Sequence, residues 1–346
     1  PRFSPDGTEV AYLEERTELK VIDLASGRSR TVMPGEMSFS YTDGDQWYDW
    51  SPDGRWFLIQ YFPAGRWGDE EVGLAPSSGE GEFVNITRSG YWDVAPRWAM
   101  NGEMIIWRSD RHGSRQQAGW PAQYDVFGAF FTREAWDRFR MTEAEFEQHE
   151  EKAKGADDEN GDDEGGAADD ENRDDGIELP DPVDLELERL EDRTVRLSLH
   201  SADLADARLT PDGEKLLYLA KFEKGYDLWL YEHRKHEDRQ LAKLDAEDAD
   251  GLQLDEDGKK AFVLVDRAIK IVGLEDGKVT PVAVTAKMEL DAAAERGYLF
   301  EHAWRQTKKK FYDEDLHGVD WEFYKAEYEK FLPHIDNNWD FAELIS

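Results

Sequence analysis

The sequence predicts a mainly β protein: a β-propeller of four-stranded antiparallel blades, followed by a short α-helical segment. Three observations lead to this fold class. A turn triplet recurs along the chain, strand-like runs follow each copy, and the apolar period changes to that of a helix near residue 286. A period repeated in series indicates one supersecondary unit copied several times.

The recurring triplet is Pro-Asp-Gly, with its aspartate at Asp6, Asp53 and Asp212 and with degenerate copies centred on Asn101 and Asp257. Asp53 follows Asp6 by 47 residues, Asn101 follows Asp53 by 48, and Asp257 follows Asp212 by 45. Proline presets φ for the first central residue of a turn, Asp or Asn bonds its own backbone, and glycine accepts positive φ. Each copy therefore predicts a tight turn.

Each turn precedes a short run rich in β-branched and aromatic residues, and a second such run follows after a polar gap. A third run then leads toward the next triplet, and we take the strand before each triplet as the last of the preceding unit. This gives four strands in about 45 residues, the length of a propeller blade, whereas a β-sandwich would lack the long-period copy. Five starts predict about five blade equivalents in residues 1–285, the first of them incomplete. The runs are 9–13, 55–61, 103–107, 215–219 and 260–265, then 19–24, 71–74, 124–130, 226–231 and 268–272, with 83–87 as a third run.

The period is interrupted between Asn101 and Asp212, which lie 111 residues apart. An insert at about 133–185 explains the excess, and we expect it between two strands of one blade, on a rim loop. It opens with a helix-like charged stretch and continues into an acidic tract with 11 Asp or Glu in residues 157–175. Because such a tract has too little apolar content to fold alone, we expect an acidic disordered insert. The strand pattern resumes at 185–190 and 193–197.

From about residue 286 the apolar residues recur at helical spacing. We interpret 286–346 as the start of a helical core domain, truncated at Ser346. A turn at 315–318 separates the first two helices, Asp320 is the expected N-cap of the second, and Pro333 ends it. The predicted inward positions are Phe300, Trp304, Thr307 and Phe311, then Trp321, Tyr324, Tyr328 and Phe331, and finally Phe341, Leu344 and Ile345 in a helix from about Asn338.

Composition excludes several classes of function. The formal net charge of −36 disfavours nucleic acid as a partner, since phosphate contacts need clustered Lys and Arg; a high-salt habitat or a plainly solvated surface would explain it. The absence of cysteine excludes disulfides, thiol nucleophiles and Cys-ligated metals. The sequence contains no run of 18 apolar residues, so it does not predict a membrane-spanning helix. Because the chain begins at Pro1 inside a blade, it is expected to be a fragment. The compartment, cytoplasmic or periplasmic, stays open.

Two acidic or histidine-rich patterns resemble metal sites. His233 and His236 lie three apart in a polar segment, where an exposed hairpin loop explains them better than metal ligation, because no further ligands are near. An EF-hand spacing is matched loosely by Asn160, Asp162, Glu164, Gly165 and Glu171. An acidic low-complexity tract produces such matches by coincidence, so diffuse attraction of cations is the simpler interpretation.

Other candidates also favour structural roles. His317 could serve as a catalytic base, but no Ser or acid partner can be assigned to it, and it lies in an interhelical turn. Aromatic residues beside blade turns usually pack between blades rather than stack on ligands. No G-x-S-x-G, H-E-x-x-H or phosphate-binding glycine loop occurs. The sequence therefore assigns no catalytic, cofactor-binding or metal-ligating residue. The aromatic residues concerned are Trp47, Trp50, Trp92 and Trp98.

The C-terminal segment contains four distinctive stretches, 300–305, 311–313, 317–321 and 339–346. Together they resemble the helical core segment of tricorn-type serine peptidases. The sequence of the blades agrees with this resemblance, because the acidic insert follows 131–136 and the stretch 222–229 fits TolB-like propeller repeats. The order of propeller, acidic insert and His-Gly-Val-Asp-Trp helices is more specific than the Pro-Asp-Gly repeats, which many propellers share.

The resemblance implies a PDZ domain and a catalytic α/β domain after Ser346, with the catalytic residues outside this sequence. The full protein would then be a serine peptidase (a hydrolase), and this chain a non-catalytic part that gates or channels short peptides to a downstream active site, without a cofactor. Its expected partners are peptide substrates and those missing domains, and a homo-oligomer is compatible with the sequence.

Two other functions remain open. A TolB-like propeller could act only as a protein-interaction module, although such a module has no need of the amphipathic helices at 300–331. The propeller of a prolyl-oligopeptidase-type enzyme would require an α/β-hydrolase sheet next, and the helical pattern from 286 disfavours it.

Overall fold

The computed structural model describes residues 1–39, 46–63, 69–115, 122–160, 179–182 and 184–346, with 153–160 described by their backbone. The chain divides into two compact units, residues 1–282 and 283–346. We call them the blade unit and the helical unit.

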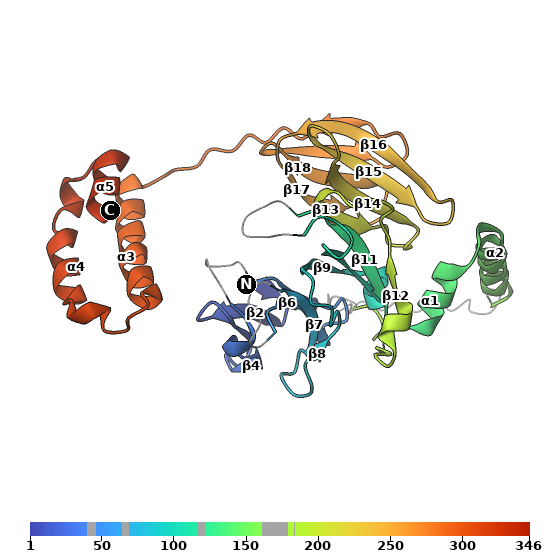
Figure 1. The fold of residues 1–346 in the computed structure, drawn as a ribbon, viewed down its shortest axis with the longest axis horizontal. Coiled ribbons are helices and arrows are strands. Elements are labelled where there is room, and N and C mark those ends of the chain that lie inside the picture. The colour runs from blue at the N-terminus through green and yellow to red at the C-terminus, as the bar shows by residue number, and fades with distance from the viewer. Residues whose placement is uncertain (40–45, 64–68, 116–121, 161–178, 183) are drawn as a thin grey trace, which may run out of the picture. The chain divides into compact units, whose positions relative to one another are not determined.

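The described part of the blade unit contains five four-stranded antiparallel sheets, each in the simple order of the chain (Figure 1). The predicted fold class, a mainly β propeller followed by helices, is confirmed. The first sheet also has four strands, although its first strand is only two residues long. Blade 1 contains β1 (Arg2–Phe3), β2 (Glu9–Glu14), β3 (Glu18–Asp23) and β4 (Ser29–Met33), followed by the 3-10 turn η1 (Gly35–Met37); blade 2 contains β5 (Tyr48–Trp50), β6 (Trp56–Tyr61), β7 (Glu71–Pro76) and β8 (Val84–Asn85). Blade 3 contains β9 (Asp93–Ala99), β10 (Met104–Ser109), β11 (Asp125–Phe130) and β12 (Thr194–Arg196), with η2 (Met100–Gly102) between its first two strands; blade 4 contains β13 (Asp203–Leu209), β14 (Lys215–Lys221), β15 (Tyr226–Glu232) and β16 (Glu237–Ala246); blade 5 contains β17 (Ala249–Leu254), β18 (Lys260–Val265), β19 (Ala268–Gly273) and β20 (Val279–Pro281).

The strand before each triplet belongs to the same sheet as the strand after it, so our division of the repeat is wrong by one strand. In blade 2, Gly54 N donates to Ser51 O at 2.9 Å and Ser51 N donates to Trp56 O at 2.8 Å. These bonds close a hairpin, and Trp50 then lies opposite Phe57 in the β5–β6 register. A tight turn of this kind can only join neighbouring antiparallel strands.

The full triplets share one hydrogen-bond pattern. The Ser51 hydroxyl accepts from Trp56 N at 2.9 Å, and the Asp53 carboxylate accepts from Arg55 N at 3.1 Å. The corresponding bonds recur at Ser4 and Asp6 and at Thr210 and Asp212. The copy at 255–258 forms the same turn, with an Asp255 carboxylate oxygen accepting from Lys260 N at 2.8 Å. The copy at 100–102 instead forms η2, with positive φ at Met100 and Asn101.

Turns of neighbouring blades pack on one another, so the repeat also acts between blades. A Cβ atom added to Gly54 would lie 3.6 Å from Pro5 Cδ in the turn of the preceding blade. One added to Gly258 would lie only 2.7 Å from Pro211 Cδ, and Gly258 has φ +63. The glycine of the triplet therefore serves both the left-handed turn and the contact with the next turn.

Hydrophobic side chains between consecutive blades form the core of the unit. One cluster of the described residues lies between each pair of neighbours, from blades 1 and 2 to blades 4 and 5. Alternate residues of each strand supply these clusters, as period-two strands require. Representative members are Val21 with Phe57, Leu74 with Ile105, Ile106 with Tyr218, and Leu230 with Val263.

The insert leaves the sheet after β11 and returns at β12, which pair with each other. The helix-like opening expected for the insert forms α1 (Arg133–Arg140) and α2 (Glu143–Asn160), so the description of the whole insert as disordered is too broad. The reason is packing: the rings of Trp136 and Phe139 lie 5.3 and 4.7 Å from that of Phe130. Most of the acidic tract, 161–175, lies outside the described residues.

The strand predicted at 185–190 does not form. The Arg193 guanidinium donates to the backbone carbonyls of Phe130, Glu186 and Glu188, which occupies acceptors that a neighbouring strand would need. Leu190 is buried and starts the 3-10 turn η3 (Leu190–Arg193). The strand predicted at 193–197 is β12.

The helical unit contains α3 (Ala292–Lys310), α4 (Trp321–Glu329) and α5 (Asn338–Ile345), joined by the turns η4 (Leu316–Gly318) and η5 (Leu332–His334). Asp320 caps α4 as predicted, accepting from Phe323 N at 3.0 Å. None of the helices in the described residues is long and apolar enough to span a membrane.

Only part of the predicted inward face of these helices is buried. Phe300 and Phe341 are buried, and the rings of Trp304 and Trp321 pack 4.3 Å apart. Phe311 and Phe331 are exposed, because α3 ends at Lys310 and α4 at Glu329, so both residues lie beyond a helix end. Several expected inward residues instead line an open apolar groove of about 400 Å³, among them Trp304, Tyr324, Tyr328, Leu344 and Ile345.

Candidate functional site

The histidine pair of the blade unit does not form a metal site. His233 is half-buried in the β15–β16 turn, with Nδ1 3.0 Å from Glu214 O and its ring stacked 4.4 Å from that of Phe139. His236 is exposed, and its Nδ1 lies 3.3 Å from the Tyr231 hydroxyl. The exposed-loop interpretation therefore holds for His236 only. Burial lowers the pKa of His233 below its usual value.

The EF-hand-like spacing cannot be assessed, since Asp162, Glu164, Gly165 and Glu171 lie outside the described residues and Asn160 ends α2. Within the part of the chain that is described, no group of three or more His, Asp and Glu side chains is arranged to hold a metal ion.

His317 has the acid partner that could not be assigned from sequence. Its Nδ1 lies 3.1 Å from an Asp313 carboxylate oxygen, and its Nε2 is hydrogen-bonded to the Tyr312 hydroxyl. The residue has φ 54 within η4, and its side chain is 53% exposed. These contacts fasten the turn between α3 and α4, in keeping with a structural role.

Three of the four tryptophans beside the turns pack between blades, as predicted. Trp50 is buried with its ring 4.1 Å from that of Phe57 in the cluster of blades 1 and 2. Trp47 and Trp98 pack against the cluster of blades 2 and 3. Trp92 is half-buried.

A charged cluster missed at the sequence level lies on the first strands of the blades. β13 contacts both β9 and β17, the first strands of the neighbouring blades, as expected if the first strands lie toward the axis about which blades are arranged. The residue two positions before each turn is Arg2, Asp49, Arg97, Arg208 or Gln253 in blades 1 to 5, respectively. We call these five equivalent positions the axial layer. Their equal offset from the triplet is the sequence signal that could have revealed them.

Salt bridges connect the axial layer from blade to blade. Arg2 Nη1 lies 3.2 Å from Asp49 Oδ1, and Arg208 Nη1 lies 2.7 Å from Asp206 Oδ1. Arg97 reaches the same Asp206 oxygen only at 3.9 Å. Asp206 is almost fully buried and also accepts from the backbone N–H of Ala207 and, across the blade boundary, of Leu252 at 3.1 Å.

The electrostatics of the layer are those of crowded, partly desolvated charges. Burial raises the pKa of Asp49, although Arg2 and Arg97 oppose the change. Burial lowers the pKa of Arg97, and the nearby Arg208 lowers it further. Two arginines and two aspartates thus act on Arg97, whose charge is mainly disfavoured by burial.

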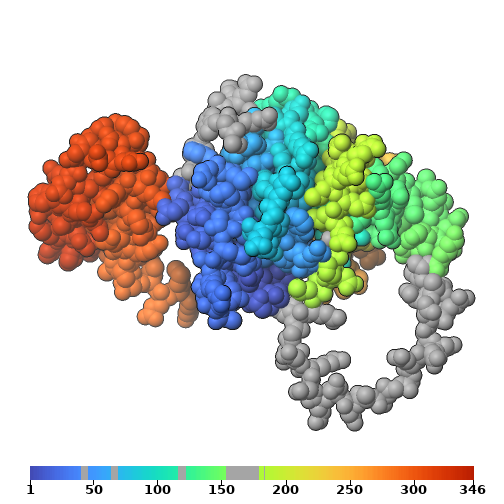
Figure 2. All heavy atoms as spheres, turned by 90° about the horizontal axis from the view of Figure 1, so that it is seen from below, coloured from blue at the N-terminus to red at the C-terminus, as the bar shows by residue number. Residues whose placement is uncertain are grey.

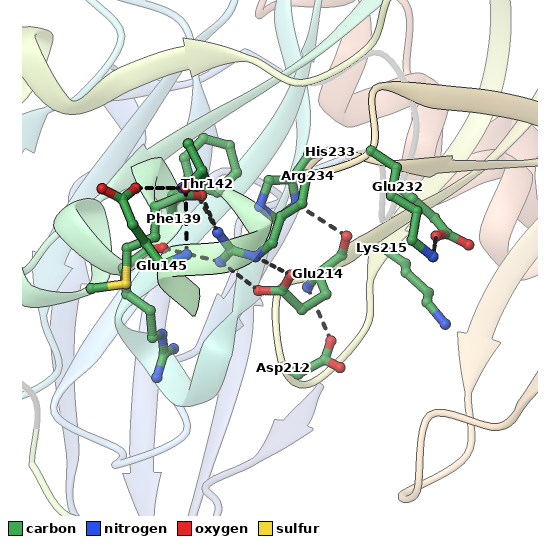
Figure 3. A network of polar contacts seen from close by, with 12 residues as sticks. Phe139, Thr142, Glu145, Asp212, Glu214, Lys215, Glu232, His233 and Arg234 are labelled. Carbon is green, nitrogen blue, oxygen red and sulfur yellow. Dashed lines mark hydrogen bonds and ion pairs between the residues drawn. The ribbon is translucent and has the colours of Figure 1, made fainter. Parts of the chain in front are cut away.

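A second polar network fastens the insert to blade 4 (Figure 3). Arg234, in the β15–β16 turn, donates to both Glu214 carboxylate oxygens, at 2.5 and 2.8 Å. The same guanidinium donates to the carbonyls of Met141 at 2.5 Å and Arg138 at 3.0 Å, at the end of α1, and lies 3.9 Å from the centroid of the Phe146 ring. In Figure 2 the helices lie beside the returning segment, to which Arg133 is joined by an ion pair with Glu186 at 2.8 Å.

Comparison with known proteins identifies relatives of both units. Residues 292–346 match the family model of the tricorn protease C1 domain. The predicted resemblance to tricorn-type peptidases is confirmed. The crystal structure of the tricorn protease matches with a TM-score of 0.67 and 13% identity over 99% of this chain. This chain covers 32% of that one, so it spans about a third of the tricorn protease's length.

Two further solved structures are similar over part of this chain. TolB from Acinetobacter baumannii has a TM-score of 0.43 and 15% identity, with 80% of this chain and 54% of that chain covered. The β-propeller domain of the Trilobed protease from Pyrococcus furiosus has a TM-score of 0.43 and 17% identity, with 82% and 68% covered.

Proposed function

We propose that this chain is the non-catalytic propeller and core segment of a tricorn-like serine peptidase, in which the axial layer guides short peptides toward an active site elsewhere in the protein. The observation that carries the proposal is the match of residues 292–346 to the tricorn protease C1 domain, directly after five blades. Partly exposed charged side chains at equivalent positions of successive blades give a peptide repeated polar contacts on rigid strands.

The first test separates this chain from catalysis. Chain 1–346, purified alone, should not cleave unstructured peptides, whereas the full-length protein should cleave them and lose activity with a serine-directed inhibitor. Inhibitor-sensitive cleavage by chain 1–346 alone would overturn the assignment of a non-catalytic role.

The second test addresses passage of the substrate. This chain has no cysteine, so a single cysteine can be introduced at the exposed axial-layer residue Gln253 and coupled to a bulky maleimide. In the full-length protein, the label should lower kcat/KM for peptides while a small chromogenic ester is still cleaved. The matched control is Thr280→Cys, on the last strand of the same blade, where the label should have no effect. Equal inhibition from both positions would refute guidance along the axial layer.

The interaction-module alternative makes a different prediction. If the propeller serves only for protein binding, labelling Gln253 should leave peptide cleavage by the full-length protein unchanged. The unlabelled protein should then hold a protein partner, and the label should displace that partner.

A further inference from the structure

The axial layer has a specific chemistry beyond guidance. Three of its positions are arginines in a chain of net charge −36, and they face two carboxylates, Asp49 and Asp206. An acidic protein that places arginines on successive first strands creates a local attraction for anions.

Asp206 does not satisfy both arginines beside it. Its oxygens already accept from Arg208, from Ala207 N and from Leu252 N at distances of 2.7 to 3.1 Å. Arg97 stays 3.9 Å away, and its Nε is buried without a hydrogen-bond partner in the described structure. A hydrogen-bond acceptor from outside the chain would give the Arg97 guanidinium the partner that Asp206 does not provide.

The Arg97 guanidinium also lies over an aromatic ring. Its guanidinium carbon lies 5.2 Å from the centroid of the Trp47 ring, and that of Arg2 lies 5.8 Å from the same ring. Stacking of this kind orients a planar guanidinium and leaves its edge available for hydrogen bonding. The Arg97 and Arg208 side chains are 24% and 20% exposed, so solvent, and hence a small ligand, reaches both.

We infer that Arg97 and Arg208 form a binding site for a carboxylate group of a peptide ligand. Both arginines already approach a carboxylate oxygen, Asp206 Oδ1, Arg208 at 2.7 Å and Arg97 at 3.9 Å, and a guanidinium group matches the paired oxygens of a carboxylate. The peptide nature of the ligand rests on the proposed function, but the carboxylate site does not. The carboxylate could belong to an acidic side chain or to a C-terminus.

The test measures binding directly by calorimetry with chain 1–346. Three N-acetylated tripeptides are compared: Ala-Glu-Ala amide, its neutral counterpart Ala-Gln-Ala amide, and Ala-Gln-Ala with a free carboxyl terminus. We expect the neutral amide not to bind and at least one acidic peptide to bind. The two acidic peptides distinguish a side-chain carboxylate from a C-terminal one.

The variant Arg97→Gln should weaken binding of the acidic peptide at least tenfold. Arg97→Lys keeps the positive charge but loses the paired N–H donors of the guanidinium, so its affinity should lie between those of the wild type and Arg97→Gln. Arg133→Gln is the matched control, since that arginine is 68% exposed in an ion pair on the insert, and its affinity should equal the wild type. Arg97 is chosen because its loss leaves the short bonds of Asp206 intact. Urea unfolding of each variant confirms that it folds.

Equal binding of the neutral amide, binding of inorganic phosphate but of no carboxylate, or insensitivity to Arg97→Gln would overturn the inference. Failure of the proposed function looks different. In that case the acidic peptide still binds chain 1–346, but labelling Gln253 leaves cleavage by the full-length protein unchanged.

Discussion

Arg234 is predicted to hold the insert helices on blade 4, and its replacement by methionine tests this. The side chain is only 7% exposed, and its guanidinium joins three elements: the Glu214 carboxylate after the blade 4 triplet, the carbonyl end of α1 and the Phe146 ring of α2. Methionine keeps much of the apolar stem but removes every one of these polar contacts.

The expected loss is about 3 kcal/mol. Hydrogen bonds to charged groups contribute about 1.5–3 kcal/mol, and removing one partner of a buried pair costs about 3–5 kcal/mol. The Glu214 side chain is 19% exposed and can be rehydrated in part, so the lower end of the second range applies. Most of the loss should fall on the docking of α1, because two of its last carbonyls lose their donor.

Hydrogen exchange followed by mass spectrometry measures this docking locally. A destabilisation of about 3 kcal/mol corresponds to roughly 100-fold faster exchange of the α1 amides, if they exchange by undocking. Amides of α3, in the helical unit, serve as the internal reference and should not change.

The adjacent Lys235→Met is the matched control. Lys235 is 49% exposed and pairs with Glu232 at 2.6 Å, so its loss should cost less than about 1 kcal/mol and leave α1 exchange within a fewfold of wild type. Unchanged α1 exchange in Arg234→Met, or an equal acceleration in Lys235→Met, would refute the reasoning.

Three further predictions concern the blades. Gly258→Ala should destabilise the blade unit by about 2 kcal/mol in urea unfolding, since it adds left-handed strain to the 2.7 Å approach to Pro211; a change below about 0.5 kcal/mol would contradict this. Asp125→Asn should cost about 3 kcal/mol, because this buried carboxylate accepts from Arg196 at 2.6 Å, and a wild-type urea midpoint would refute it. Burial lowers the pKa of His233 below 6.5, so the unfolded state binds more protons than the folded state, and stability should fall as the pH drops below about 6.5. His233→Phe should reduce this loss of stability. An NMR titration that gives His233 a pKa above 6.5 would contradict the prediction.

Much of the fold follows from local chemistry, which is why it could be predicted. Turn residues with fixed φ preferences and period-two apolar runs act within a few residues, and both survive in every blade. The assignment of strands to sheets required one more step: the bond from Gly54 N to Ser51 O makes the triplet a hairpin within a blade rather than a boundary between blades. Reading the turn type, instead of the interval alone, would have corrected the division.

Non-local contacts explain the errors. The segment 185–190 has an alternating pattern suited to a strand, yet Arg193 takes the carbonyls that a strand partner would bind. The insert helices are highly charged, and what orders α1 is the pairing of Phe139 and Trp136 with Phe130 and the bonds of Arg234 from a different blade. The bonds from Arg234 to the end of α1 span more than 90 residues, so no window along the chain reveals them. The ring pairs and the bonds from Arg193 to Glu186 and Glu188 span fewer than ten residues, but no spacing rule used for the sequence describes them.

The triplet and the axial layer divide one repeat into two roles. At the turn, the hydroxyls of Ser4, Ser51 and Thr210 accept the same backbone hydrogen bond, and in blade 5 the Asp255 carboxylate takes their place. Two residues earlier the blades carry Arg, Asp, Arg, Arg and Gln, a mixture that no hairpin geometry requires. The axial-layer position has the same offset from the turn and is at least partly exposed in every blade, but its side chain differs from blade to blade. The hairpin fold therefore does not determine which residue occupies it. Selection by a ligand then becomes the simplest account of why three arginines stand there in so acidic a chain.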